Sequence, residues 1–239
     1  MRMNLIAEEG GFAVLNDNAV MRTGARAGIE ADFYAHTGRS IDKWHHYLEV
    51  YERHLSRFRD RSVRLLEIGV QRGGSLQLWR RYLGSTAIIH GLDVDPTCMT
   101  NVDPETNVRV HTGDQADVHL LAAIVEEMGG VDVVIDDGGH QNGAQIASFE
   151  YLYPQLAADG VYICEDTHTS YWPEYGGSPS GAGSFIAHAK MLVDLLHGWH
   201  TDAVASHAFA AHTKSILFYD SMVVLERARR EPPTRSIVP

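Results

Sequence analysis

Acidic side chains gather at two points of the sequence, each directly after a run of apolar residues. Residues 135–140 read IDDGGH and follow VDVV, while residues 164–168 read CEDTH and follow VYI. Carboxylates buried beside a core are strongly unfavourable unless a cation or hydrogen-bond donors compensate their charge. Asp137, Glu165 and Asp166 end two successive apolar runs, and hard oxygen ligands of this kind favour Mg²⁺ or a similar divalent ion.

A simpler interpretation exists for the DDGGH segment taken alone. Asp is a good helix cap and Gly-Gly bends freely, so these residues could form only a turn before a helix. The EDTH segment at the neighbouring strand end favours the metal site instead. His140 lies within one turn of that site and is better placed than the other histidines to act as a general base.

Apolar runs alternate with helical segments along most of the chain. Predicted strands span residues 64–70, 87–94, 108–114, 131–137 and 160–166, and predicted helices span residues 41–58, 74–83, 118–128, 144–156 and 185–198. Strands that are apolar throughout and alternate with helices are typical of a parallel sheet covered on both faces. Two further runs, within residues 215–227, meet at Asp220-Ser221 and predict an antiparallel hairpin that closes the sheet.

This pattern predicts the α/β fold class, with one doubly wound, mostly parallel, seven-stranded sheet and an antiparallel C-terminal hairpin. We expect a single domain over residues 41–228. Residues 1–40 are interpreted as a loose N-terminal arm or lid, although a frayed terminus explains them equally well. The basic, proline-containing residues 229–239 are expected to form a flexible tail. The Gly/Ser/Pro/Tyr-rich loop 167–184 is expected to close over a substrate.

Ligands of an open parallel sheet bind outside the carboxyl ends of its strands. Each of five consecutive predicted strands finishes with an acid, and these acids are Glu67, Asp93, Asp114, the Asp136-Asp137 pair and the Glu165-Asp166 pair. A rim of negative charge favours a cationic ligand, a metal ion or a hydroxyl-rich molecule.

The turn after the first of these strands differs from a dinucleotide-binding fingerprint. Its sequence LLEIGVQRGGSL lacks G-x-G-x-x-G and places Glu67 where a pyrophosphate would be repelled. S-adenosylmethionine suits this turn, because it carries a sulfonium and an ammonium but no phosphate. Asp93 is placed to accept the ribose hydroxyls, or it simply begins an Asx turn. Asp114 and Gln115 end the next strand, where an adenine edge would lie.

The overall composition narrows the choice of partners and location. The formal net charge is −11 and no basic patch stands out, which disfavours nucleic acids and anionic membranes. Cys98 and Cys164 are the only cysteines, which suits a reducing cytosol better than a disulfide framework. The sequence has no signal-like or membrane-length apolar run, so we expect a soluble, cytoplasmic protein.

The sequence resembles the class I S-adenosylmethionine-dependent methyltransferases, and more narrowly the metal-dependent sugar O-methyltransferases of macrolide biosynthesis. The resemblance runs from about Asp42 to Arg227. Its carriers are DKWHHYLEVYE, LLEIGVQRGGSLQLWRRYL, IHGLDVD, HTGDQAD, VDVVIDDGGH, SFEYLYPQL and GVYICEDTHTSYW. The most specific of these features is DDG-x-H followed by EDTHTSYW at this distance.

The resemblance implies a role for each group of site residues. Mg²⁺ would be bound by Asp137, Glu165 and Asp166, with His140 as the general base. The S-adenosylmethionine site would be lined by Glu67, Gly69, Ser75, Asp93, Asp114, Gln115 and Asp136, and the acceptor pocket by His168, Tyr171 and Trp172. The resemblance also implies a small-molecule glycoside substrate and a homo-oligomer. Close relatives carry an N-terminal auxiliary domain where this chain has only residues 1–40, which leaves assembly and acceptor size open.

Three other functions are compatible with parts of this pattern. A catechol-type methyltransferase would share the fold, cofactor and metal and differ in its acceptor. A nicotinamide oxidoreductase would use a similar sheet, but the missing G-x-G-x-x-G and the acid-rich rim disfavour it. A repurposed S-adenosylmethionine-binding module without catalysis is the third.

Overall fold

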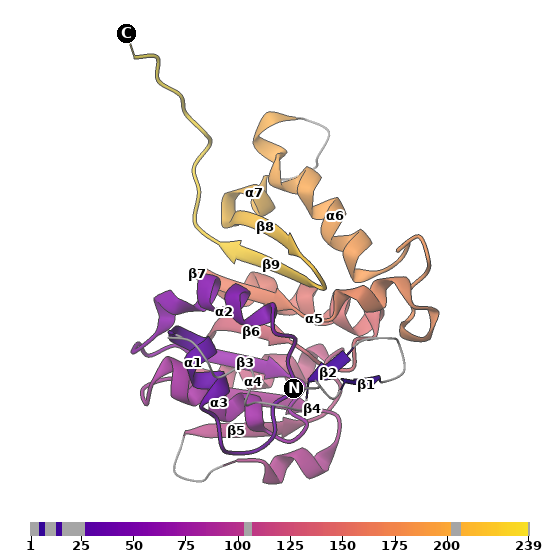
Figure 1. Cartoon of the computed structure of the whole chain (residues 1–239). Helices are drawn as coiled ribbons and strands as arrows, with labels where there is room; N and C mark the ends of the chain where they lie inside the picture. Colours follow the sequence, from indigo (N-terminus) through magenta and orange to yellow (C-terminus); the bar gives the residue numbers. More distant parts are fainter. Residues whose placement is uncertain (1–4, 8–12, 16–26, 103–106, 202–206, 239) are drawn as a thin grey trace.

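A single seven-stranded sheet forms the centre of the computed structural model, which describes residues 5–7, 13–15, 27–102, 107–201 and 207–238. Its strands are β3 (Arg64–Ile68), β4 (Ile88–Asp93), β5 (Val108–Thr112), β6 (Val131–Asp136), β7 (Leu156–Cys164), β8 (Thr213–Tyr219) and β9 (Met222–Arg227). Their order is β5-β4-β3-β6-β7-β9-β8 (Figure 1). The strands from β5 to β7 pair in parallel, and β9 pairs antiparallel with both β7 and β8. The predicted doubly wound sheet and its C-terminal hairpin are confirmed.

Two groups of helices cover the two faces of this sheet (Figure 1). The first group is α1 (Gly28–Tyr34), α2 (Tyr47–Leu55) and α3 (Gly74–Leu83), and the second is α4 (Val118–Met128), α5 (Asn142–Gln155) and α6 (Phe185–Leu196). Tyr51 and Trp79 pack with Ile135 of the sheet on the first face, while Phe149 packs with Val134 on the second. Successive strand residues therefore point into different cores, as the two-residue period of a strand requires.

Three short elements lie outside these two layers. β1 (Leu5–Ala7) and β2 (Ala13–Leu15) pair antiparallel in a separate two-stranded sheet, and α7 (Ala208–His212) precedes β8. Residues 228–238 have no regular secondary structure, and most of them are exposed. No described helix has the length and hydropathy needed to cross a membrane.

The segment before α2 differs from the expectation of a loose arm over residues 1–40. Ile29 in α1 is fully buried, its backbone N–H donates to Glu52 in α2 (2.8 Å), and Phe33 packs against the same core. The prediction of a loose arm is therefore wrong for residues 27–40, because α1 covers apolar surface on α2 and α3. Residues 1–4, 8–12 and 16–26 of the predicted arm lie outside the described residues.

The start of the first long helix also differs from the prediction. The pattern of residues 41–58 predicted a helix from residue 41, but α2 begins at Tyr47 and residues 41–44 have no regular structure. This non-helical segment brings the Lys43 side chain to carboxylates that follow β6 and β7. The predicted helix start is wrong because a distant ionic contact, invisible in local periodicity, determines the path of the chain.

Two histidines lie side by side on the strands at one edge of the sheet. His111 on β5 and His90 on β4 share a hydrogen bond of 2.9 Å between Nε2 and Nδ1, and His90 is only 3% exposed. Burial, with a smaller contribution from His111, lowers the pKa of His90 from 6.5 to about 4. Both rings are therefore neutral near pH 7.

Acid should destabilise the fold through His90. A histidine whose pKa is lower in the folded chain contributes its full stability above about pH 6.5 and loses it as the pH falls toward 4, because the unfolded chain then binds more protons. Urea denaturation at about pH 7 and about pH 4.5 gives the fall in the free energy of unfolding for each protein. This fall should be smaller by about 2 kcal/mol in His90→Gln than in the wild type. Equal falls in the two proteins would contradict this assignment.

Candidate active site

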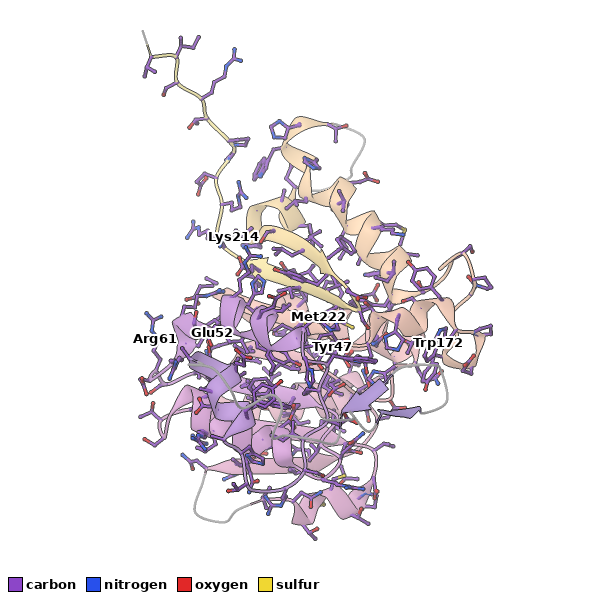
Figure 2. All side chains as sticks on the ribbon, viewed as in Figure 1. Tyr47, Glu52, Arg61, Trp172, Lys214 and Met222 are labelled. Atoms are coloured by element: carbon purple, nitrogen blue, oxygen red, sulfur yellow. The ribbon has the colours of Figure 1, made fainter. Side chains whose placement is uncertain are left out.

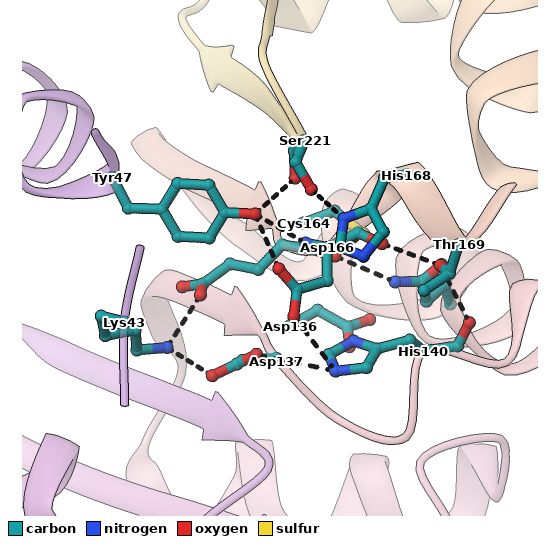
Figure 3. Close-up of polar contacts among 12 residues, drawn as sticks. Lys43, Tyr47, Asp136, Asp137, His140, Cys164, Asp166, His168, Thr169 and Ser221 are labelled. Atoms are coloured by element: carbon teal, nitrogen blue, oxygen red, sulfur yellow. Dashed lines mark hydrogen bonds and ion pairs between the residues drawn. The ribbon is translucent and has the colours of Figure 1, made fainter. Parts of the chain in front are cut away.

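Acidic residues from two adjacent strands meet at the carboxyl edge of the sheet. Asp137 directly follows β6, and Glu165 and Asp166 directly follow β7, which pairs with β6 in parallel so that Asp136 lies opposite Cys164. His140, in the turn after β6, places Nε2 3.4 Å from the Asp166 carboxylate and 4.0 Å from that of Asp137 (Figure 3). One ligand atom from each of Asp137, His140 and Asp166 fits within a 4.8 Å cluster. The structure thus brings together four residues that the sequence pointed to.

A lysine that the sequence analysis missed lies among these carboxylates. The Lys43 ammonium donates to Glu165 Oε2 (2.8 Å) and to Asp137 Oδ2, and its side chain is 3% exposed (Figure 3). Burial alone would lower the pKa of Lys43, but the charges of Asp137, Glu165 and Glu67 outweigh it and raise the pKa above its ordinary value. Lys43 is therefore a permanent cation of the site. Its only signal in the sequence was its place in the DKWHHYLEVYE segment.

Two tyrosines of α2 complete the support of the acids. Tyr51 donates from its hydroxyl to Glu165 Oε1 (2.5 Å). Tyr47 donates to Asp166 Oδ1 (2.7 Å) (Figure 3). Burial first, and then the neighbouring carboxylates, raise the pKa of both tyrosines, so the hydroxyls stay protonated and act as donors. Sequence periodicity predicted these residues only as the apolar face of a helix, and their hydroxyls give them a second role.

The residues present fit a hard divalent cation. Burial raises the pKa values of Asp137 and Glu165, Lys43 opposes both rises, and repulsion by Asp166 and by Asp137, respectively, adds to them. A bound cation would favour the ionised form of both acids, and the ligands offered are mainly carboxylate oxygens. His140 Nδ1 is buried and has no hydrogen-bond partner among the described residues. Glu165 is the most recessed of the predicted ligands, because it is 1% exposed and both of its oxygens already accept a hydrogen bond.

The predicted cofactor residues on β3 and β4 lie on the other side of the topological switch between β3 and β6. Glu67 is fully buried and accepts hydrogen bonds from Ser75 Oγ (2.7 Å) and Trp79 Nε1 (2.8 Å), while burial raises its pKa to about 7. Gly69 has φ of 91°, and a Cβ there would collide with the backbone carbonyl of Asp137. Glycine at this position lets the two halves of the carboxyl edge approach each other.

Asp93 holds the loop that follows β3. Its carboxylate accepts from the backbone N–H groups of Val70 (2.8 Å), Gln71 (2.9 Å) and Asp95 (2.9 Å). Partial burial would raise the pKa of Asp93, but these donors lower it below the ordinary value, so the group is an anion near pH 7. Both predicted roles of Asp93, an Asx-type turn and an acceptor for ribose hydroxyls, are compatible with this geometry.

Asp136 lies beneath the site and does not line it. Its fully buried carboxylate accepts hydrogen bonds from Ser148 (2.7 Å), Tyr162 (2.9 Å) and Gln115 (3.0 Å). The prediction that Asp136 contacts the cofactor is wrong for this geometry, because its side chain points into the core under α5. Gln115 is held by the same network, whereas Asp114 is exposed and accepts from the Ala116 N–H (2.8 Å).

The predicted acceptor residues lie on the loop that follows β7. His168 is in the short 3₁₀ helix Thr167–Tyr171, where Nδ1 pairs with Ser221 Oγ and the ring meets Trp172 edge-on with centroids 4.7 Å apart. Tyr171 is 42% exposed, and Trp172 lies on the same loop near the start of α6 (Figure 2). Asn142 of α5 anchors this loop by donating to the carbonyls of Thr169 and Tyr175. Closure of the loop over an acceptor stays a prediction.

Part of this chain matches a known protein family. Residues 66–167 match a family model described as a methyltransferase domain. Over this segment the chain is similar to a methyltransferase domain. The seven-stranded sheet with its antiparallel C-terminal hairpin is the class I methyltransferase fold.

Several curated relatives of this chain are named as O-methyltransferases. It is 35% identical over 213 residues to 8-demethyl-8-(2-methoxy-alpha-L-rhamnosyl)-tetracenomycin-C 3'-O-methyltransferase of Streptomyces olivaceus, covering 80% of this chain and 51% of that protein. It is 36% identical over 162 residues to mycinamicin VI 2''-O-methyltransferase of Micromonospora griseorubida, covering 64% and 40%. The resemblance seen in the sequence is confirmed, and the chain spans about half the length of the curated relatives it matches.

A solved structure extends the similarity to three dimensions. The structure of MycE methyltransferase from the mycinamycin biosynthetic pathway in complex with Mg, SAH and mycinamycin VI has 31% sequence identity and a TM-score of 0.71. The match covers 79% of this chain and 50% of that chain.

Asp136→Asn should destabilise the fold strongly. An asparagine places an N–H₂ group among donors that all need an acceptor, and each buried donor left unpaired costs about 1–3 kcal/mol. We expect a fall in Tm of roughly 10 °C by thermal denaturation. Asp114→Asn is the matched control, because its side chain is exposed, and it should change Tm by less than about 2 °C. Similar losses of Tm in both variants would show that the buried hydrogen bonds of Asp136 do not account for the effect.

Proposed function

We propose that this chain is the catalytic part of an S-adenosylmethionine-dependent, divalent-metal-dependent O-methyltransferase that acts on a sugar hydroxyl of a glycosylated small molecule. The proposal rests on one observation. Ligand atoms of Asp137, His140 and Asp166 lie within 4.8 Å of one another, and the buried Glu165 accepts from Lys43 in the same cluster. The rhamnosyl compound in the name of one relative supports the sugar acceptor, and the Mg and SAH in the MycE complex support the metal and the methyl donor.

The β3 and β4 side of the carboxyl edge would bind the methyl donor. We assign this role to Glu67, Gly69, Ser75, Asp93, Asp114 and Gln115. Glu67 provides a buried acid near the positive groups of S-adenosylmethionine, and the ionised Asp93 can accept the ribose hydroxyls. Asp136 would act indirectly, by holding Gln115 and the turn that follows β6.

The β6 and β7 side would bind and activate the acceptor. A hard divalent ion held by Asp137, Asp166 and Glu165 would lower the proton affinity of an acceptor hydroxyl and orient it. His140 would remove that hydroxyl proton through Nε2, and the adjacent Asp166 and Asp137 carboxylates would stabilise the resulting imidazolium. His168, Tyr171 and Trp172 would line the acceptor pocket.

The methyl transfer then needs only alignment of the two reactants. The acceptor oxygen forms a bond to the methyl carbon while the carbon–sulfur bond breaks, giving a methyl ether and S-adenosylhomocysteine. The reaction consumes the sulfonium charge, so the surrounding acids bind the donor and do not accelerate the transfer. Most of the rate should come from holding the oxygen in line with the departing sulfur.

The remaining expectations concern partners and location. The formal net charge of −11 supports a small-molecule substrate and disfavours nucleic acid as a partner. We retain the homo-oligomer and the cytoplasmic location as parts of this proposal.

Chelation of divalent ions should abolish methyl transfer. With S-adenosylmethionine and a panel of rhamnosyl and olivosyl glycosides, S-adenosylhomocysteine should form in Mg²⁺ and fall to background in excess EDTA. Binding of S-adenosylmethionine, measured by calorimetry, should survive EDTA, because its residues lie on the β3 and β4 side. Turnover that persists in EDTA would refute the metal requirement. If a catechol were methylated and no glycoside of the panel were, the sugar acceptor would be refuted.

His140→Ala should lower kcat about 10² to 10⁴-fold, the usual contribution of a general base. Stopped-time assays measure this loss, and calorimetry checks that Mg²⁺ still binds. His119→Ala is the control, because that histidine is exposed on α4, and it should retain wild-type turnover. If His140→Ala instead abolished Mg²⁺ binding, His140 would be a metal ligand and not the base.

A further inference from the structure

Lys43 compensates the charge of a buried site from a distant part of the chain. It lies 94 residues before Asp137 and 122 residues before Glu165, and it reaches both from the non-helical segment that precedes α2. Its ammonium is 6.0 Å from the centre of the Tyr51 ring, and Tyr51 donates to the second oxygen of Glu165. Glu165 is therefore held from both sides by groups of the N-terminal segment and α2.

A second lysine of this chain shows what distinguishes Lys43. Lys214 on β8 donates to Glu226 at 2.8 Å, the same distance as Lys43 to Glu165, but its side chain is 58% exposed (Figure 2). Glu226 is itself only 9% exposed, but it also pairs with Arg57 and His54, so removing the solvated Lys214 ammonium would not leave a buried carboxylate unpaired. The Lys43 pairs are shielded from water, so loss of the lysine would leave buried carboxylates without a counter-ion.

At Asp137, Lys43 and the proposed metal can use different oxygens. Lys43 occupies Asp137 Oδ2, whereas Asp137 Oδ1 lies 4.0 Å from His140 Nε2. Ligand atoms of Asp137, His140 and Asp166 lie within 4.8 Å of one another. When all three carboxyl groups are ionised, they and the Lys43 ammonium carry two net negative charges, which is the charge that one divalent ion would neutralise. The arrangement suits one divalent ion together with the lysine.

We propose that Lys43 is the built-in counter-ion of this site, which holds Asp137 and Glu165 together before a divalent ion arrives and limits how tightly that ion binds. The inference rests on the proposed function for the identity of the metal site. Without Lys43, mutual repulsion would spread the carboxylates and destabilise the metal-free protein. A divalent ion would then replace the missing charge, so metal binding would stabilise the variant more than the wild type.

The experiment compares Lys43→Met with Lys214→Met and the wild type by thermal denaturation, in EDTA and in saturating Mg²⁺. In EDTA we expect Lys43→Met to lose roughly 10 °C in Tm and Lys214→Met less than about 2 °C. In Mg²⁺ the gap between Lys43→Met and the wild type should shrink by at least about half. An equal or smaller Mg²⁺-induced rise in Lys43→Met than in the wild type would overturn the inference.

A charge-restoring variant keeps the inference testable if Lys43→Met does not fold in EDTA. Lys43→Met combined with Glu165→Gln removes one positive and one negative charge, so its Tm in EDTA should exceed that of Lys43→Met by several degrees. A double variant no more stable than Lys43→Met would show that packing, not charge, explains the loss. If Mg²⁺ fails to shift the Tm of the wild type, the metal assignment of the proposed function fails. A wild-type shift without the extra shift in Lys43→Met defeats only the inference about Lys43.

Discussion

The need to compensate carboxylates buried at the ends of β6 and β7 determines much of this structure. Glu165 is 1% exposed and would be strongly unfavourable there as an anion without Lys43 and Tyr51. Both groups come from the chain around the start of α2, so that segment must cross the carboxyl edge of the sheet before the helix begins. The hydrogen bonds of this buried cluster connect Lys43 and α2 to the ends of β6 and β7. They therefore couple the position of α2 to the geometry of the site.

The strand order explains why these acids lie beside the residues assigned to a methyl donor. The chain forms β3, β4 and β5 outward in one direction and then returns to form β6 and β7 on the other side of β3. The helices that follow β3 and β6 cover opposite faces of the sheet, so the loops after these two strands leave it in opposite directions. Gly69 lies at this point against the backbone carbonyl of Asp137. The methyl donor and the acceptor would therefore meet where the two loops approach each other closely.

Local patterns predicted the sheet, the bounds of α3 and α4, and the strand ends that carry the acids. Gly84 and Gly129, both with positive φ, end those two helices, and such signals are visible in the sequence. Lys43 could not be predicted in this way, because its partners are about a hundred residues away and a lysine before a helix normally contacts water. The buried position of Asp136 could have been predicted from the sequence. Asp136 lies two residues after Val134 and shares its strand face, which points into the second core, whereas Asp137 follows one residue later on the opposite side.

Backbone strain at two residues supports the view that the site, and not stability alone, shaped these loops. His140 and Asp166 are two of the six described non-glycine residues with positive φ; theirs is 54° and 51°, a left-handed conformation that costs such residues roughly 1 kcal/mol each. Glycine would relieve that cost at either position but would remove the imidazole or the carboxylate. The two strained residues follow neighbouring strands and bring Nε2 of one to 3.4 Å from the carboxylate of the other. Strain that converges on one pair of reactive groups is expected where side-chain placement matters more than the stability of the loop.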